Sequence, residues 1–145
     1  MDIAALIVWV ITALGGFVLL GTWIQRGGLQ QQRSGTSRLP APVVFGHFVL
    51  AAAGLVVWIV YVVTDTQALA WVAVVLLVVI ALLGFTMFAR WLPVRRAAAP
   101  AAGAEVSAEV PAEKHFPVPV VAAHGVVAVA TVLLVLLSAL GVGGS

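Results

Sequence analysis

Four long apolar segments constrain the fold of this 145-residue chain more than any other feature. They are Ile3–Ile24, Val43–Val63, Ala68–Ala89 and Val118–Leu140, and none of them contains a Lys, Arg, Asp or Glu. A helix needs about 20 apolar residues to cross the hydrocarbon core of a bilayer, and each segment supplies them. The runs do not alternate in polarity and are about twice the length of a membrane β-strand. We therefore predict four membrane-spanning helices.

The composition agrees with this prediction. Only 8% of the residues are charged, against about 25% in a typical soluble domain. Such a chain cannot cover a water-facing surface, so we expect an all-α integral membrane protein surrounded by the lipid bilayer. The chain has no cysteine, which excludes disulfides, thiolate metal sites and cysteine-bound iron–sulfur clusters.

The basic residues predict the orientation of the helices. All of them lie in the loops after the first and third segments: Arg26, Arg33 and Arg38 in one, and Arg90, Arg95, Arg96 and Lys114 in the other. Positively charged loops stay in the cytoplasm, so both termini should lie outside. The Ala- and Val-rich composition is typical of a GC-rich bacterium, so we expect the bacterial cytoplasmic membrane. The positive charge is explained by orientation, and no nucleic-acid partner is expected.

Two patterns occur twice along the chain. A Pro-x-Pro-Val-Val sequence at 40–44 precedes His47, and its counterpart at 117–121 precedes His124 at the same spacing. An Ala-Leu-x-Gly-Phe sequence at 13–17 recurs at 81–85. A tryptophan follows each copy of the second pattern, again at the same spacing. We predict a four-helix transmembrane bundle of two duplicated, parallel helical hairpins related by a pseudo-two-fold axis along the membrane normal.

On this interpretation the first repeat covers residues 3–63 and the second covers residues 68–140 of a single transmembrane domain. The segment 97–114 is rich in Ala, Pro and Glu and is predicted to be a flexible cytoplasmic linker. Trp23, Trp71 and Trp91 lie near segment ends and are expected to be interfacial anchors. Trp9 and Trp58 lie deeper and are expected to pack inside the bundle.

The paired histidines are the main candidates for function. A histidine inside a membrane is costly and is interpreted as functional by default. His47 and His124 lie at the same predicted depth near the cytoplasmic side, on two helices related by the pseudo-two-fold axis. Two imidazoles so arranged can bind opposite faces of one haem iron. We therefore predict one haem b with these two histidines as metal ligands. His115 lies in a loop and is a weaker candidate.

Other residues are expected to surround this haem. Gly16 and Gly84 would let the porphyrin edge approach the backbone. Small residues on the histidine faces would leave room for a flat cofactor: Ala51, Gly54, Ala128 and Thr131. Three aromatic residues are expected to pack on the ring: Phe17, Phe45 and Phe85. Three arginines are expected to neutralise the propionates: Arg26, Arg38 and Arg90.

This arrangement resembles the haem-bearing four-helix core of the cytochrome b superfamily. In that family, histidines of the second and fourth helices bind haem b, and glycines of the first and third helices accommodate the ring. His47, His124 and the two glycines named above stand at these positions. The resemblance covers all four segments and is architectural. Family cores usually hold two haems, but Tyr61 and Ser138 occupy the depth of the second histidine pair here.

These residues leave three interpretations of the histidines: haem ligands, ligands of another metal, or side chains that only hydrogen-bond a neighbouring helix. The first predicts a small b-type cytochrome that transfers one electron at a time, with a quinone or a respiratory complex as partner. The alternative is a non-catalytic subunit or scaffold of a larger respiratory or transport complex. No nucleophile–base pair, phosphate-binding loop or intramembrane carboxylate relay appears in the sequence, so we expect no stand-alone hydrolase, kinase or pump activity.

Overall fold

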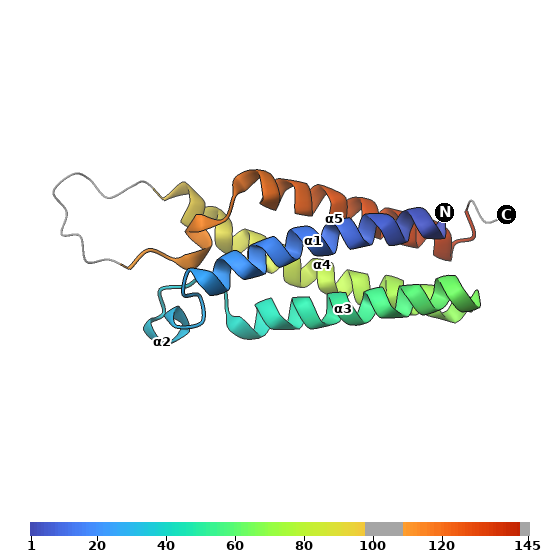
Figure 1. Ribbon diagram of the computed structural model, residues 1–145, viewed down its shortest axis with the longest axis horizontal. Coiled ribbons are helices and arrows are strands. Elements are labelled where there is room, and N and C mark those ends of the chain that lie inside the picture. The colour runs from blue at the N-terminus through green and yellow to red at the C-terminus, as the bar shows by residue number, and fades with distance from the viewer. Residues whose placement is uncertain (98–108, 143–145) are drawn as a thin grey trace.

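Four long helices form the described part of the chain, residues 1–97 and 109–142 of a computed structural model (Figure 1). They are α1 (Asp2–Gln25), α3 (Ala41–Thr64), α4 (Gln67–Arg96) and α5 (Val118–Ala139). A short helix, α2 (Gln31–Ser34), and a 3-10 turn, η1 (Ala112–His115), lie in the two connections at one end of the bundle. The start of α1 and the end of α5 lie at the other end.

Each of the four helices is long and apolar enough to cross a membrane, which confirms the four predicted apolar helices. Their outer faces are apolar as well: Val126 is 70% exposed and Phe85 is 65% exposed. Soluble proteins rarely present continuous apolar surfaces of this kind to water. The outer surface of the bundle is therefore suited to contact with lipid chains.

The helices pack mainly in two pairs, α1 with α5 and α3 with α4. Contacts between α4 and α5 and between α1 and α3 are less extensive. Helices α3 and α5, which carry His47 and His124, therefore lie on opposite corners of the bundle. This arrangement directs the two histidines toward the space between the pairs.

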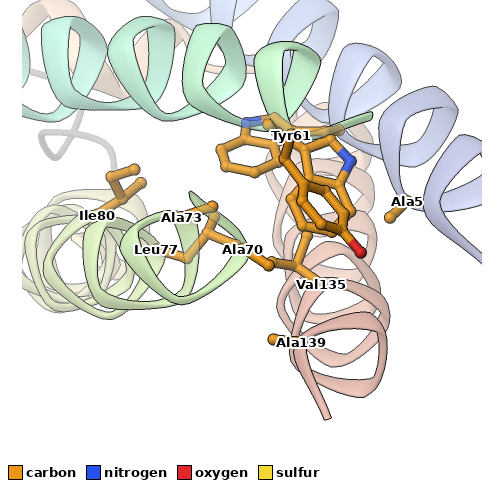
Figure 2. Packing of buried hydrophobic residues seen from close by; sticks show 10 residues of the cluster. Ala5, Tyr61, Ala70, Ala73, Leu77, Ile80, Val135 and Ala139 are labelled. Carbon is orange, nitrogen blue, oxygen red and sulfur yellow. The ribbon is translucent and has the colours of Figure 1, made fainter. Parts of the chain in front are cut away.

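The half of the bundle near the termini is filled by an aromatic cluster. The ring of Trp58 lies 6.5 Å from that of Trp9 and 4.7 Å from that of Tyr61. Figure 2 shows that residues from all four long helices meet around these rings. The small members of this cluster are Ala5, Ala70, Ala73 and Ala139. Small residues allow close helix packing, and both tryptophans are buried as predicted.

At the end of the bundle that carries the two loops, the burial of two tryptophans differs from the prediction. Trp23 and Trp91 were expected to be interfacial anchors, but they are 0% and 5% exposed, so this expectation is wrong for both. The Trp23 indole N–H donates to Ser37 Oγ at 3.2 Å, and the Trp91 indole N–H donates to the Glu113 carbonyl at 3.0 Å. The two loops fold over the helix ends and cover the rings. Trp71, at the other end of the bundle, is 44% exposed.

A buried carboxylate joins these two loops. Glu113 is fully buried, and its side chain accepts hydrogen bonds from the Ser37 hydroxyl at 3.0 Å and from the Arg38 backbone N–H. Gln31 makes a second link, because its side-chain amide donates to the Val110 carbonyl and accepts from the Ala112 N–H. We call the side chains of Gln31, Ser37 and Glu113 the polar junction.

The polar junction limits the predicted linker. Residues 98–108 of the segment 97–114 lie outside the described residues. Its final part is not free of packing, because Ala112 and Glu113 in η1 are both 0% exposed. The sequence shows few apolar residues there, and the fixed conformation comes instead from hydrogen bonds to the first loop.

Helix α4 extends beyond the predicted end at Ala89 to Arg96 and includes Pro93. Trp91 and Val94 are buried in this additional stretch, which packs against η1. Packing of these side chains accounts for the extension. Arg95 and Arg96 in the last turn also interact favourably with the negative end of the helix dipole.

We predict that Glu113→Ala destabilises the protein by about 1–3 kcal/mol, because it leaves the Arg38 N–H without its acceptor and removes the shorter of the two hydrogen bonds of the Ser37 hydroxyl. Thermal unfolding in one detergent measures this loss. Glu109→Ala is the matched control, since Glu109 is exposed and makes only longer hydrogen bonds of 3.3 to 3.4 Å. Equal unfolding midpoints for the two variants would show that the polar junction does not stabilise the fold.

Candidate metal centre

Two imidazoles meet in the interior of the bundle. His47 on α3 and His124 on α5 have ring centres 6.4 Å apart, with an angle of 60° between the ring planes. Each lies six residues after the first residue of its helix, or about 9 Å along the axis. The structure thus places the two predicted ligands at one depth, near the end that carries the arginine-rich loops.

Each imidazole is held by a backbone carbonyl of the helix beside it. His47 Nδ1 lies 2.9 Å from the Ile80 carbonyl oxygen, and His124 Nδ1 lies 2.9 Å from the Thr12 carbonyl oxygen. A carbonyl only accepts hydrogen bonds, so Nδ1 carries the proton in both rings. The lone pair of each neutral imidazole is then on Nε2, the nitrogen available to a metal. Carbonyl acceptors of this kind orient histidine ligands in many metal sites.

Glycines leave the space that the imidazoles fill. A Cβ atom added to Gly84 would lie 3.3 Å from His47 Cε1, and one added to Gly16 would lie 3.2 Å from His124 Cε1. One added to Gly15 would lie 3.3 Å from His124 Nδ1. The closest contacts of Gly16 and Gly84 are therefore with the histidine rings. Their predicted contact with a porphyrin edge stays a prediction.

The distance between the two ring centres can be compared with that of two imidazoles bound to one metal. An imidazole nitrogen binds a metal at about 2 Å and its ring centre lies roughly 1 Å further away, so two rings on opposite sides of one metal have centres about 6 Å apart. The observed separation is 6.4 Å. Within residues 1–97 and 109–142, no group of three or more His, Cys, Asp or Glu side chains is placed to bind a metal. Two imidazoles are few for zinc, but they suffice as axial ligands of haem iron.

The three phenylalanines that were predicted to pack on the haem ring do not form one cluster. Phe17 is 55% exposed and packs edge-on against Phe48 with ring centres 5.6 Å apart. Phe85 is also on an outer face. Phe45 packs against the buried Trp23 with ring centres 6.3 Å apart. Their predicted packing on a haem ring remains a prediction.

The small residues that follow His47 on α3 contact the aromatic cluster. Gly54 is buried, and an added Cβ there would lie 3.0 Å from the Trp9 ring. Ala51 is partly buried against the same cluster. Tyr61 and Ser138, at the depth of a second haem in the resembled family, are buried too. Ala128 is partly exposed. The space toward the termini is therefore filled by side chains.

The side chain of Arg90 contacts the backbone of Arg38 at the loop end. Arg90 Nη1 donates to the Arg38 carbonyl at 3.3 Å, and both side chains are exposed. Arg26 caps the end of α1 at the same end of the bundle and is exposed as well. His115 lies in η1, where its Nδ1 is 3.3 Å from the Ala112 carbonyl. It is not part of the histidine pair.

Several residues of the site were not anticipated from the sequence. The carbonyls of Thr12 and Ile80 have no side-chain signature, although the two residues each stand directly before a copy of the Ala-Leu-x-Gly-Phe pattern. Gly15 adjoins Gly16, but its equivalent in the second copy is Leu83, so the repeat gave no reason to select it. The burial of Glu113 could not be predicted from the sequence, because a single Glu in a polar loop is usually exposed to solvent.

Comparison of the chain with known protein families, with curated proteins and with solved structures found no match. The geometry of the histidine pair is therefore the basis for assigning a function.

We predict that Gly84→Leu displaces the His47 ring and lowers stability by about 1–3 kcal/mol through overpacking. Gly125→Leu on α5 is the matched control, because nothing lies within 4 Å of a Cβ added there. Unfolding midpoints in one detergent compare the two variants. If Gly84→Leu is as stable as Gly125→Leu, then the close approach of His47 to Gly84 is not a constraint on the fold.

Proposed function

We propose that this chain is a small b-type cytochrome of the bacterial cytoplasmic membrane that binds one haem b through His47 and His124. The observation that carries the proposal is the spacing of the two rings, whose centres lie 6.4 Å apart. Both rings use Nδ1 for a backbone carbonyl, so both keep Nε2 for the iron. The cytochrome b superfamily resemblance supports the same ligand pair.

The residues around the pair have defined roles in this proposal. Haem b, when bound, supplies an iron that accepts and releases one electron at a time. The Ile80 and Thr12 carbonyls orient the imidazoles, and Gly16 and Gly84 leave room beside them. The aromatic cluster excludes water on the side of the termini. Arg38 and Arg90 lie at the loop end, where the Arg90 guanidinium donates to the Arg38 carbonyl, and their charges are suited to the propionates.

We further propose that the chain is a duplicated hairpin, with parallel repeats and both termini outside the cell. The equivalence of contacts supports this proposal: Thr12 and Ile80 accept from the two histidines, and Gly16 and Gly84 pack on them. The members of each pair stand at the same place in the two copies of the Ala-Leu-x-Gly-Phe pattern. The arginine-rich end then faces the cytoplasm. A site near that end would exchange electrons there, with a quinone or a respiratory complex as partner.

One feature favours a second candidate, a non-catalytic subunit or scaffold of a larger membrane complex. The exposed Trp71 and its neighbours on α4, Val72, Val75 and Leu76, form a shallow, open apolar surface. A helix of a partner protein could pack against such a surface. This candidate does not require a cofactor, so haem binding separates the two.

We predict opposite accessibility for two engineered cysteines in an otherwise cysteine-free chain. Ser34→Cys lies at the arginine-rich end and should be protected from an impermeant thiol reagent added to intact cells. Thr66→Cys, between α3 and α4, should be labelled. Both positions are exposed, so neither result depends on burial. Labelling of Ser34→Cys alone would reverse the proposed orientation.

We predict that the full chain, expressed with ample haem supply, purifies with a low-spin haem b spectrum. His47→Ala and His124→Ala should each lose the haem or convert it to a high-spin form, because each removes one axial bond. His115→Ala is the matched control and should keep the wild-type spectrum. Optical spectra of the oxidised and dithionite-reduced proteins provide the measurement.

A folded, monodisperse wild-type protein without haem would refute the cytochrome proposal and favour the scaffold. A normal spectrum in both His47→Ala and His124→Ala would also refute it, because the haem would then be held elsewhere.

A further inference from the structure

Two threonines form a hydrogen bond between α1 and α5 in the apolar interior. The hydroxyl oxygens of Thr12 and Thr131 lie 3.0 Å apart, and Thr131 is only 1% exposed. Each hydroxyl is also 2.9 Å from a carbonyl of its own helix, that of Val8 or Val127. The two hydroxyl protons can serve one bond between the hydroxyls and one bond to a helix carbonyl, so both are used and the pair costs little to bury.

The same Thr12 supplies the backbone carbonyl that accepts from His124. Thr131 is seven residues after His124, which places both on the same face of α5 two turns apart. Helix α5 therefore holds Thr12 at two points, the carbonyl through His124 and the hydroxyl through Thr131. Two attachments to one residue fix the carbonyl, and with it the direction of the imidazole.

The residues equivalent to Thr12 and Thr131 beside His47 do not form such a hydroxyl pair. Alignment of the repeated patterns makes Ile80 the equivalent of Thr12, and Gly54 the equivalent of Thr131. Neither has a hydroxyl, and the space beside Gly54 is filled by Trp9 and Ile80 side chains. Ile80, whose carbonyl holds His47, therefore packs near Gly54 through its apolar side chain and makes no hydroxyl bond to α3. Each histidine thus bonds to a backbone carbonyl, but only the residue that holds His124 also has a side-chain hydroxyl in contact with the histidine's helix.

We propose that Thr131 and Thr12 are positioning residues for His124, and that the two axial ligands are therefore inequivalent. The ligand role rests on the proposed function, while the effect on the His124 ring does not require haem. Loss of a residue that orients a metal ligand typically costs about 10- to 100-fold in affinity. We expect Thr131→Val to lower haem affinity by at least about tenfold.

The test uses the full chain in detergent, with ¹⁵N-labelled histidine, as wild type and as Thr131→Val, Thr12→Val and Thr131→Ser. NMR of the haem-free protein reports the Nδ1–H of each ring, and single His47→Gln and His124→Gln variants assign the signals. Titration with haem measures affinity. Thr86→Val is the matched control, because the Thr86 hydroxyl is exposed and bonds only to the Leu82 carbonyl at 2.8 Å.

We expect Thr131→Val and Thr12→Val to shift the His124 signal and to leave the His47 signal in place. Thr131→Ser keeps the hydroxyl and should give the wild-type His124 signal. Thr86→Val should change neither signal. Should Thr131→Val fail to fold, Thr12→Val decides the question. An unchanged His124 signal in the valine variants, or equal shifts of both histidines, would overturn the proposal. If wild type binds no haem but the His124 signal still shifts, the proposed function fails while the positioning role stands.

Discussion

The hydrogen bonds from His47 and His124 to backbone carbonyls link the helices within each of the two closely packed pairs. An imidazole among apolar side chains needs a partner, since a buried polar group without one costs free energy. Each ring finds its partner on an adjacent helix, α4 for His47 and α1 for His124, at 2.9 Å. These are the two helix pairs with the most extensive packing. The glycines belong to the same constraint, because a side chain at Gly16 or Gly84 would press on the ring.

The two ends of the bundle are stabilised by different physical means. Toward the termini, aromatic rings and alanines fill the interior, and Trp58 also donates to the Asp2 carbonyl at 3.3 Å. Toward the loops, the interior is closed by Trp23 and Trp91 and by the buried carboxylate of Glu113. The histidine pair lies between these two regions. Packed side chains therefore border the imidazoles on both sides, as the proposed metal site requires.

Much of the fold was predictable from hydropathy alone, because an uncharged apolar run of sufficient length permits little besides a membrane helix. The convergence of His47 and His124 was predictable from the repeated patterns, which assign the histidines equivalent positions. The burial of Trp23 and Trp91 was not, since it depends on loops whose conformation is fixed by Glu113 and Gln31. Nor was the Thr12–Thr131 pair, because a helical threonine usually bonds its own backbone and gives no sign of a partner across the bundle.

The central claim is that both histidines bind one iron. Pulsed EPR on the oxidised full chain, prepared with ¹⁵N-labelled histidine and unlabelled haem, tests it most directly by counting the labelled nitrogens bound to the iron. The account predicts a low-spin centre with two axial histidine nitrogens per haem. A centre with one histidine nitrogen or none would contradict it.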